Sequence, residues 1–331
     1  MGAGGLGADI AGAGGTEGAA GARFPQELMY AAATQYYLED ANQADIARRL
    51  GVSRATVSRL LTEARRQGIV EIRVRRPAGL EGGRLAAEVA EAVGLRQVHL
   101  VPRAEGPRLG PWLAPGVARA LAAVGPLPGD VIVVSSGSTV YECAQEDLGH
   151  FPGVMVAPAV GGQEEPQPWF QTNETTRILA ERLGGVPSYL YAPALPGPAL
   201  FGSLQDEPSF RRINELWGRA KCALVGVGAA PLMRQVLPSF VPSDAPSLRN
   251  AVGDVCSRFY DQDGLPVSYP GSDRVVATSL ADLRRIPVSI AVAVGQEKIP
   301  SIVAGARGGY FNVLVSDVPT AEGLLAATRA R

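Results

Sequence analysis

The sequence is poor in the residues from which metal centres, disulfide frameworks and most acid–base catalysts are built. It contains three cysteines, Cys143, Cys222 and Cys256, and two histidines, His99 and His150. The cysteines are isolated and have no Cys-x-x-Cys spacing, so we expect no zinc site and no disulfides, and a reducing cytoplasm fits best. Neither histidine has a nearby acid or cysteine pattern, and we expect both to be structural or surface residues. No metal and no cofactor are predicted.

Long apolar runs are also absent. No segment approaches the roughly 20 apolar residues that a membrane-spanning helix needs, so we expect a soluble protein with no membrane partner. Residues 1–22, MGAGGLGADIAGAGGTEGAAGA, lack the basic region and the long apolar core of a signal peptide. Leu6 stands where a myristoylation motif has Ser or Thr. We therefore expect residues 1–22 to form a disordered tail.

A helix-turn-helix is indicated by residues 43–74, QADIARRLGVSRATVSRLLTEARRQGIVEIRV. Gly51 suits a tight turn, Val52 points back inward, and Ser53 is a good N-cap for the second helix. The apolar residues of each helix recur on one side, at the spacing of a buried face: Ile46, Ala47 and Leu50 on the first, and Val57, Leu60, Leu61 and Ala64 on the second. An ordinary amphipathic helix pair is the alternative, but it does not require this turn, cap and polar outer face together.

The outer face of the second helix carries guanidinium and hydroxyl groups, which suit phosphates and base edges better than a core. These candidate DNA-binding residues are Arg54, Thr56, Ser58, Arg59, Thr62 and Arg65. Residues 43–76 hold nine arginines and three acids, a balance of +6, whereas the whole chain is −1, so the remainder sums to −7. Positive charge is concentrated where double-stranded operator DNA would bind.

Neighbouring segments complete this domain. Pro25 suits the start of an earlier helix, whose apolar residues are Leu28, Met29, Ala32, Tyr36 and Tyr37. Beyond Gly68, alternation over residues 69–74 predicts a strand, either a wing beside the DNA or an exit strand. Residues 75–79 have the composition of a linker. We expect an all-α, winged or plain, helix-turn-helix domain at 23–76 and an effector and oligomerisation domain at 77–331.

The remainder of the chain is long enough for a domain of ordinary size with its own core. In it, short β-branched runs alternate with helix-like segments; the runs are residues 97–101, 130–135, 154–158, 188–191, 222–227, 288–294 and 312–315. This alternation predicts an α/β domain with a mostly parallel sheet that helices cover on both faces. In such sheets, ligands bind at the carboxyl ends of the strands.

Two of these strand ends carry small residues. Residues 131–139, VIVVSSGST, end a strand in a hydroxylated loop. Its backbone N–H groups and the hydroxyls of Ser138 and Thr139 can hold a phosphate at a helix N-terminus, although an ordinary turn also needs small capping residues. After the next strand, Gly161 and Gly162 allow backbone to approach a ligand, and a turn alone would explain them equally well.

Polar residues follow the remaining strand ends. Gln171 precedes an expected helix N-cap at Asn173. Residues 224–228, LVGVG, precede Arg234 and do not form the pattern of a dinucleotide site. Only two of the 31 basic residues are lysines, so Lys298 attracts interest.

A lysine at this strand end can neutralise a phosphate or, if desolvated, form an imine with an open-chain sugar, and an ordinary surface lysine is the alternative. Asp254 and Asp261 can accept hydrogen bonds from the hydroxyls of a polyol.

The order of motifs resembles the SorC family of bacterial transcriptional regulators, over essentially the whole chain after residue 22. The motifs are SRATVSRLL, GIVEIRV, SSGST, VGG, NETTRILA, ALVGVG, NAVGDVCSRFYDQDG, SLADLRRIP, VGQEK and FNVLVSDVPTAEGLL. The resemblance implies an effector domain with the fold of sugar-phosphate isomerases and deaminases, used for sensing without catalysis. It also implies dimers that assemble into tetramers.

The resemblance further implies a set of effector-binding residues. Ser136, Gly137, Ser138 and Thr139 would hold a phosphate, Gly161, Gly162 and Gln171 would border the sugar, Asp254 would accept from its hydroxyls, Lys298 would meet a phosphate or carbonyl, and Arg234 corresponds more loosely. This sequence departs from its relatives at residues 163–170, QEEPQPWF, and at Val160, where some relatives have a cation. A singly phosphorylated or neutral ligand is therefore favoured over a doubly phosphorylated one.

The sequence thus predicts a non-enzymatic regulator of carbohydrate metabolism, whose operator binding responds to a sugar, polyol or sugar phosphate. Two-fold operator recognition favours an even-numbered homo-oligomer, a dimer or tetramer. One alternative is a sugar-phosphate isomerase or deaminase with an appended DNA-binding head, but no Asp–His or Glu–His pair lies near the candidate loops. Another is a C-terminal domain that serves oligomerisation only.

Overall fold

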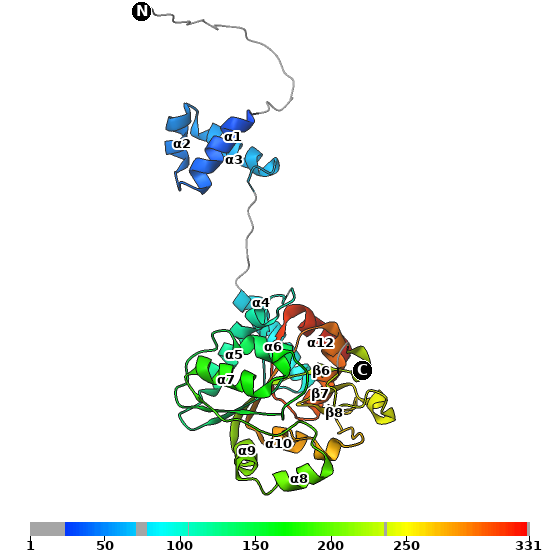
Figure 1. Cartoon of the computed structure of the whole chain (residues 1–331). Coiled ribbons are helices and arrows are strands. Elements are labelled where there is room, and N and C mark those ends of the chain that lie inside the picture. Colours follow the sequence, from blue (N-terminus) through cyan, green and yellow to red (C-terminus); the bar gives the residue numbers. More distant parts are fainter. Residues whose placement is uncertain (1–23, 71–77, 105, 235–236, 330–331) are drawn as a thin grey trace, which may run out of the picture. The chain divides into compact units, whose positions relative to one another are not determined.

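The computed structural model of the chain divides into two compact units, residues 1–76 and 77–331. It describes residues 24–70, 78–104, 106–234 and 237–329 (Figure 1). The expected tail, and the expected wing or exit strand beyond its first two residues, lie outside the described residues. The expected linker is too long at its C-terminal end, because residues 78 and 79 already belong to helix α4 (Ala78–Val93).

The N-terminal unit contains the predicted helix-turn-helix. Helix α1 spans Gln26–Tyr37, α2 spans Gln43–Leu50 and α3 spans Arg54–Arg66. Gly51 ends α2 at φ +65°, a left-handed conformation that favours glycine. The Ser53 hydroxyl caps α3 by accepting from the N–H of Thr56 at 3.1 Å, as predicted. The cap of α2 was not predicted: the Asn42 side chain accepts from the N–H groups of residues 44 and 45.

One buried cluster joins the three helices. Its fully enclosed members are Met29, Ala32, Ala33, Ile46, Ala47, Val57, Leu60, Leu61 and Ala64. Every residue predicted for the buried face of α3 is among them, and Val52 packs against the cluster as a partly buried residue. In α1 the buried side includes Ala33, whereas Tyr36 lies at the edge with 36% of its surface exposed.

The larger unit is built on a seven-stranded sheet whose described pairings are all parallel, which confirms the prediction. The spatial order is β1-β10-β9-β5-β2-β3-β4. The strands are β1 (Gln97–Val101), β2 (Val131–Val134), β3 (Met155–Pro158), β4 (Val186–Pro187), β5 (Ala220–Gly226), β9 (Val288–Val292) and β10 (Val313–Asp317).

Helices cover both faces of this sheet, as expected for strands that read as continuous apolar runs. Val131 and Val133 of β2 belong to one buried cluster, which includes side chains of α4, α9, α10, α11 and α12. Ile132 and Val134 belong to the other, with side chains of α5, α6 and α7. Burying each such side chain stabilises the fold by about 1.5–3 kcal/mol. The remaining helices are α5 (Gly110–Val124), α6 (Ser138–Ala144), α7 (Thr172–Leu183), α8 (Pro198–Leu204), α9 (Pro208–Gly218), α10 (Leu280–Arg285), α11 (Ile299–Arg307) and α12 (Val318–Arg329).

A small antiparallel sheet beside the large one was not predicted. Its strands are β6 (Gly228–Ala229), β7 (Gly253–Val255) and β8 (Arg258–Tyr260). Cys256 and Ser257 connect β7 to β8 with φ values of +53° and +59°. Two successive residues at positive φ are typical of the type I′ turn of a two-residue hairpin. Short 3₁₀ helices lie at Pro168–Phe170, Pro231–Met233, Pro246–Asn250, Ser272–Arg274 and Gln296–Lys298.

The strand predicted at residues 188–191 is wrong. Strand β4 ends at Pro187, and the Asn173 side chain then bonds both backbone groups of Leu190, accepting from its N–H at 3.0 Å and donating to its C=O at 3.1 Å. The side chain of a helix residue therefore makes the hydrogen bonds of Leu190 that we expected a neighbouring strand to make. Asn173 is also not the N-cap of α7, because that position is Gln171.

The strand order places a switch point between β2 and β5. From β2 the chain proceeds outward through β3 to β4, and it returns to β5 on the other side of β2 before continuing to β9 and β10. The loops that leave β2 and β5 therefore diverge, and ligands of open parallel sheets bind where such loops diverge. Among the described residues, no helix is long and apolar enough to cross a membrane.

Replacing Leu60 by Ala should destabilise the N-terminal unit by about 2–5 kcal/mol, because a fully buried leucine leaves a cavity among three helices. Hydrogen exchange would show faster amide exchange in α1, α2 and α3 while β5 and β9 keep their protection. The exposed Ser58→Ala variant is the control and should change stability by about 0.5 kcal/mol or less. Equal loss of protection in both units would contradict a division into two units.

Candidate functional site

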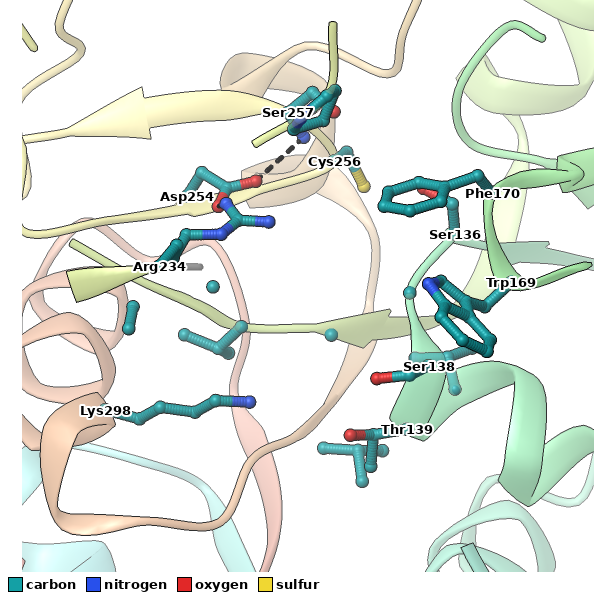
Figure 2. Close-up of a pocket in the computed structure, with 18 of the residues that line it drawn as sticks. Ser136, Ser138, Thr139, Trp169, Phe170, Arg234, Asp254, Cys256, Ser257 and Lys298 are labelled. Carbon is teal, nitrogen blue, oxygen red and sulfur yellow. Dashed lines mark hydrogen bonds and ion pairs between the residues drawn. The ribbon is translucent and has the colours of Figure 1, made fainter. Parts of the chain in front are cut away.

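A cavity of about 410 Å³ opens at the carboxyl ends of β2, β5 and β9, beside the β7–β8 turn (Figure 2). Its volume lies within the range of small-molecule sites. Seven of the ten predicted effector-binding residues line it: Ser136, Gly137, Ser138, Thr139, Arg234, Asp254 and Lys298. They come from four separate segments of the chain, so the fold brings together residues that the sequence spreads over more than half of the larger unit.

Two glycines shape the loops at the base of this cavity. Gly137, after β2, and Gly295, after β9, adopt the same backbone conformation, with φ +120° and ψ 143°. Residues with a side chain rarely adopt that conformation. Each glycine turns a strand end into a helical segment, and these segments present Ser138 and Thr139 on one loop and Lys298 on the other.

Backbone hydrogen bonds hold the loop after β2 in place. The Ser135 hydroxyl donates to the C=O of Ser136 at 3.0 Å and accepts from the N–H of Gly226 at 3.0 Å, which ties the loop to β5. The N–H of Gly137 donates to the C=O of Trp169 at 2.9 Å. That amide, which we expected to be available to a phosphate, therefore joins two walls of the cavity. The hydroxyls of Ser136, Ser138 and Thr139 and the first backbone N–H groups of α6 remain as the polar groups of this loop.

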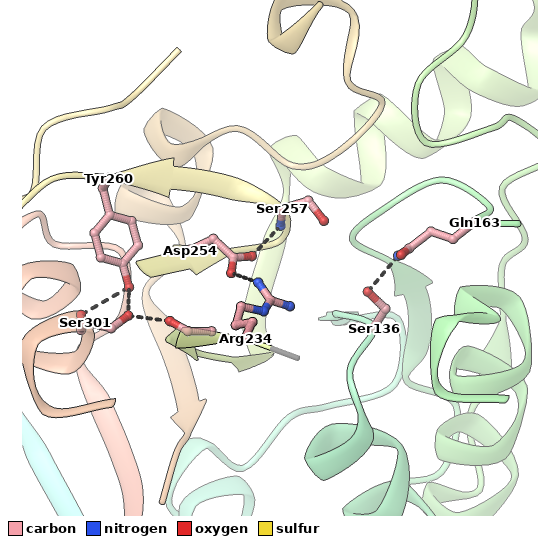
Figure 3. A network of polar contacts seen from close by, with 8 residues as sticks. Ser136, Gln163, Arg234, Asp254, Ser257, Tyr260 and Ser301 are labelled. Carbon is pink, nitrogen blue, oxygen red and sulfur yellow. Dashed lines mark hydrogen bonds and ion pairs between the residues drawn. The ribbon is translucent and has the colours of Figure 1, made fainter. Parts of the chain in front are cut away.

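An ion pair forms one wall of the cavity. Arg234 donates through Nη1 to Oδ1 of Asp254 at 2.7 Å, and Oδ2 of Asp254 accepts from the N–H of Ser257 at 3.1 Å (Figure 3). Asp254 is only 8% exposed. Its carboxylate therefore both orients Arg234 and closes the β7–β8 turn, so it is more engaged with the protein than the sequence suggested.

Lys298 lies beside this pair and is half-buried. Its side chain extends into the cavity (Figure 2) and has no hydrogen-bond or ion-pair partner among the described residues. Burial lowers the pKa of Lys298, and Arg234 lowers it further, whereas Glu297 and Asp254 oppose the shift. A cation without a partner at a cavity wall is suited to an anionic group of a ligand.

The opposite wall is uncharged, and the sequence did not predict it. Trp169 and Phe170 face the cavity across from Arg234 and Lys298 (Figure 2). Gln163 and Gln167 also line it, from the loop between β3 and α7. This loop follows the carboxyl end of β3, where parallel sheets bind ligands, so its position in the sequence could have indicated a cavity wall. From the sequence we interpreted residues 163–170 only as a departure from the family pattern.

Three predicted residues do not line the cavity: Gly161, Gly162 and Gln171. A Cβ atom on Gly161 would lie 2.8 Å from the carbonyl oxygens of Ala192 and Pro193. Gly162 exchanges hydrogen bonds with the same segment, donating to Ala192 at 2.8 Å. Gly161 therefore allows two backbones to approach each other, and Gly162 is engaged by its backbone hydrogen bonds. Gln171 donates through Nε2 to the C=O of Glu165 at 2.7 Å and holds the loop that carries the uncharged wall.

In the N-terminal unit, α3 presents the predicted DNA-binding side chains. Thr56 is half-buried and its hydroxyl contacts that of Ser53 at 2.8 Å, so it belongs to the cap. The Thr62 hydroxyl donates to the C=O of Ser58 at 3.0 Å. The other predicted side chains are exposed: Arg54, Ser58, Arg59 and Arg65.

The arginines of this unit fall into two groups. Arg48, Arg49 and Arg66 form ion pairs with Asp45, Glu39 and Glu63, respectively. Arg54 and Arg59 have no such partner among the described residues. Arg65 contacts only the C=O of residue 61 and a hydroxyl, each at 3.4 Å. Among the described residues of this unit, the guanidinium groups without an ion-pair partner are therefore those on α3 that we predicted to meet DNA.

The three cysteines are buried and free. Burial raises the pKa of Cys143 and of Cys222 to about 12, and burial also raises the pKa of Cys256. Cys256 lines the cavity, but its thiol is therefore neutral and a poor nucleophile. Burial lowers the pKa of His99. In the described part of the chain, no three His, Cys, Asp or Glu residues are grouped closely enough to hold a metal ion.

Comparison with known proteins identifies both units. The sugar-binding domain family matches residues 82–326, and the Crp-like helix-turn-helix domain family matches residues 27–82. The deoxyribonucleoside regulator of Bacillus subtilis is 34% identical, over 92% of this chain and 98% of its own length. The sorbitol operon regulator of Klebsiella pneumoniae is 31% identical, over 90% of this chain and 97% of its own length. The crystal structure of the full-length regulator SorC from Klebsiella pneumoniae superimposes with a TM-score of 0.67 at 29% identity, covering 90% of this chain and 98% of that one.

Replacing Lys298 by Met should raise the stability of the ligand-free protein at pH 7. Because the pKa of Lys298 is lower in the folded than in the unfolded chain, unfolding takes up a proton between the two pKa values, and wild-type stability recovers as the pH rises through that interval. The advantage of Lys298→Met should therefore be largest below the interval and shrink as the pH rises through it, so urea unfolding should show a smaller advantage at pH 9.5 than at pH 7. Lys221→Met, at an exposed lysine, is the matched control. A constant advantage at both pH values would contradict the assignment.

Proposed function

The chain belongs to the SorC family of transcriptional regulators, and we propose that it binds operator DNA and controls carbohydrate genes in response to a sugar, polyol or sugar-phosphate effector. One observation carries this proposal. One chain joins a helix-turn-helix, whose recognition helix bears Arg54 and Arg59, to a cavity that Lys298 lines, and none of these three cations has an ion-pair partner in the part of the chain that the structure describes. The exposed arginines suit an anionic polymer such as DNA, and the cavity with its lysine suits a small anionic ligand.

In the N-terminal unit, helix α3 would lie in the major groove. Arg54 and Arg59 would contact base edges or phosphates, Arg65 and the hydroxyl of Ser58 would contact phosphates, and Thr56 and Thr62 would act mainly by fixing the helix cap and surface. Binding to the chromosome would take place in the cytoplasm, where free, buried cysteines stay reduced.

The effector would occupy the cavity at the switch point of the large sheet. The names of two relatives, a deoxyribonucleoside regulator and a sorbitol operon regulator, support a carbohydrate-derived ligand. Hydroxyl and charged side chains would contact it: Ser136, Ser138, Thr139, Arg234, Asp254 and Lys298. Gly161, Gly162 and Gln171 would make no direct contact with the effector, because each is engaged with the surrounding backbone.

Control of DNA binding would follow from differential affinity. A ligand shifts an equilibrium between two arrangements only by the difference in its affinity for them. The cavity takes its walls from the loops after β2, β3, β5 and β9 and from the β7–β8 turn, so a bound effector favours the arrangement in which these loops fit it best. That preference would alter how the oligomer presents its helix-turn-helix units to an operator.

We propose sensing without turnover. The described residues that line the cavity include no histidine, and one of its two carboxylates, Asp254, is occupied by Arg234 and the Ser257 amide. A free base next to a ligand carbon is what an isomerase or deaminase requires. Consumption of fructose 6-phosphate or glucosamine 6-phosphate by the purified wild type, abolished in Asp254→Asn, would favour the enzyme instead.

The protein should sediment as a dimer or tetramer, because two-fold operators are matched by even-numbered oligomers with two-fold symmetry. Sedimentation equilibrium of the full chain at micromolar concentration measures this directly. A monomer at all concentrations, or a trimer, would contradict the proposal.

Arg54→Ala and Arg59→Ala should each weaken operator binding about tenfold and leave effector-induced thermal stabilisation intact, since a lost base contact costs roughly 1–3 kcal/mol. Lys298→Ala should do the reverse. The DNA would be a duplex selected from a random library by the wild type, and Arg211→Ala, at an exposed arginine of the larger unit, is the control. Unchanged operator affinity in both Arg54→Ala and Arg59→Ala would show that α3 reads DNA with another face.

A further inference from the structure

Two glutamines on the uncharged wall of the cavity leave buried oxygens without a partner. Gln163 is 8% exposed and donates through Nε2 to the Ser136 hydroxyl at 3.1 Å (Figure 3). Within the described residues, neither its Oε1 atom nor that of Gln167 has a hydrogen-bond partner, although both atoms are buried. Both residues line the same cavity.

A buried acceptor without a partner destabilises the ligand-free protein, and a donor brought by a ligand removes that penalty. A carboxylate or phosphate oxygen cannot donate to it. A hydroxyl can, and its oxygen remains free to accept from a neighbouring group. The two amides therefore suit the hydroxylated part of a ligand, beside the rings of Trp169 and Phe170, which present apolar surface to the same space.

The charges around the cavity orient such a ligand. The cations among its described lining residues are Arg234 and Lys298, and both lie on the wall opposite Trp169 and Phe170 (Figure 2). The lining residues of the uncharged wall, Gln163, Gln167, Trp169 and Phe170, include no cation. A second phosphate at this wall would meet the unpartnered oxygens of Gln163 and Gln167 rather than a positive charge.

We propose that Gln163 and Gln167 are specificity-determining residues that bind the hydroxyls of a sugar or polyol monophosphate whose single phosphate faces Lys298. This assignment rests on the proposed effector function and adds to it the orientation of the ligand and the exclusion of bisphosphates. Gln163 is positioned by Ser136, so the loops after β2 and β3 read the ligand together.

Isothermal titration of the full-length protein tests this with a matched pair of probes, fructose 6-phosphate and fructose 1,6-bisphosphate, together with sorbitol, sorbitol 6-phosphate and inorganic phosphate. Wild type should bind at least one monophosphate and bind it at least tenfold more tightly than its unphosphorylated partner or the bisphosphate. Gln163→Met and Gln167→Met should each weaken that monophosphate about tenfold, while the affinity for inorganic phosphate stays unchanged, because the phosphate end is not touched.

A gain of function completes the test. Gln167→Lys places a cation at the uncharged wall and should shift the preference toward fructose 1,6-bisphosphate by at least tenfold. Gln205→Met, at an exposed glutamine outside the cavity, is the matched control, and melting of each ligand-free variant verifies that it folds. Since Gln167 makes no hydrogen bond through its buried oxygen, Gln167→Met should melt at or above the wild-type temperature.

The outcomes separate the two proposals. If the wild type binds neither sorbitol nor any of the sugar or polyol phosphates, the effector half of the proposed function fails and this inference fails with it. If it binds sorbitol but no phosphorylated probe, the inference is overturned and the proposed function stands. If the wild type binds a monophosphate but Gln163→Met and Gln167→Met bind it equally well, the inference is overturned and the proposed function stands. A wild type that prefers the bisphosphate would likewise overturn it.

Discussion

The parallel pairing of β2 with β5 is the constraint on which the larger unit depends. After β2 the chain continues toward one edge of the sheet, and after β5 it continues toward the other edge. The loop that follows β2 and the loop that follows β5 therefore diverge, which leaves a space between them. The Ser135 hydroxyl then bridges the gap by accepting from Gly226, so the strand ends stay together while their loops separate. The cavity, its charged wall and its uncharged wall all follow from that separation.

Both units contain cations that form ion pairs and cations that do not. In the N-terminal unit Arg48, Arg49 and Arg66 form ion pairs with nearby acids, whereas Arg54 and Arg59 have no ion-pair partner among the described residues. In the larger unit Arg234 is held by Asp254, whereas Lys298 is not. The cations in ion pairs contribute to local structure, and the cations without an ion-pair partner among the described residues can bind an anionic ligand. The protein thereby separates the charges that shape it from the charges that bind.

Local sequence patterns predicted those parts of the structure that local physics determines. The cap at Ser53, the turn at Gly51 and the buried side of α3 each depend on residues a few positions apart, and all were correct. The parallel sheet followed from its continuous apolar runs.

The strand at 188–191 was wrong because Asn173, more than a dozen residues earlier, satisfies the backbone there. Gly161 was predicted to border the ligand, but a glycine that admits a second backbone looks the same in sequence as one that admits a ligand. Gln171 bonds the loop backbone instead, a contact that no local pattern predicts. The uncharged wall was missed because Gln163 and Gln167 have no pattern of their own, and only the fold places them opposite Lys298.

The loop between β3 and α7 has a consequence for how such a domain can diverge. Its residues 163–170 form one wall of the cavity and are held by polar contacts, among them those of the Gln171 side chain and the Gly137 amide. Unlike Ala159 and Val160 at the start of the loop, these residues contribute no side chain to either buried cluster. Substitutions in this loop can therefore alter what is recognised at little risk to the sheet beneath it. Substitutions confined to this segment could change the ligand that the domain binds while the sheet and the DNA-binding helix stay the same. Ligand specificity in such proteins can therefore evolve within this one loop.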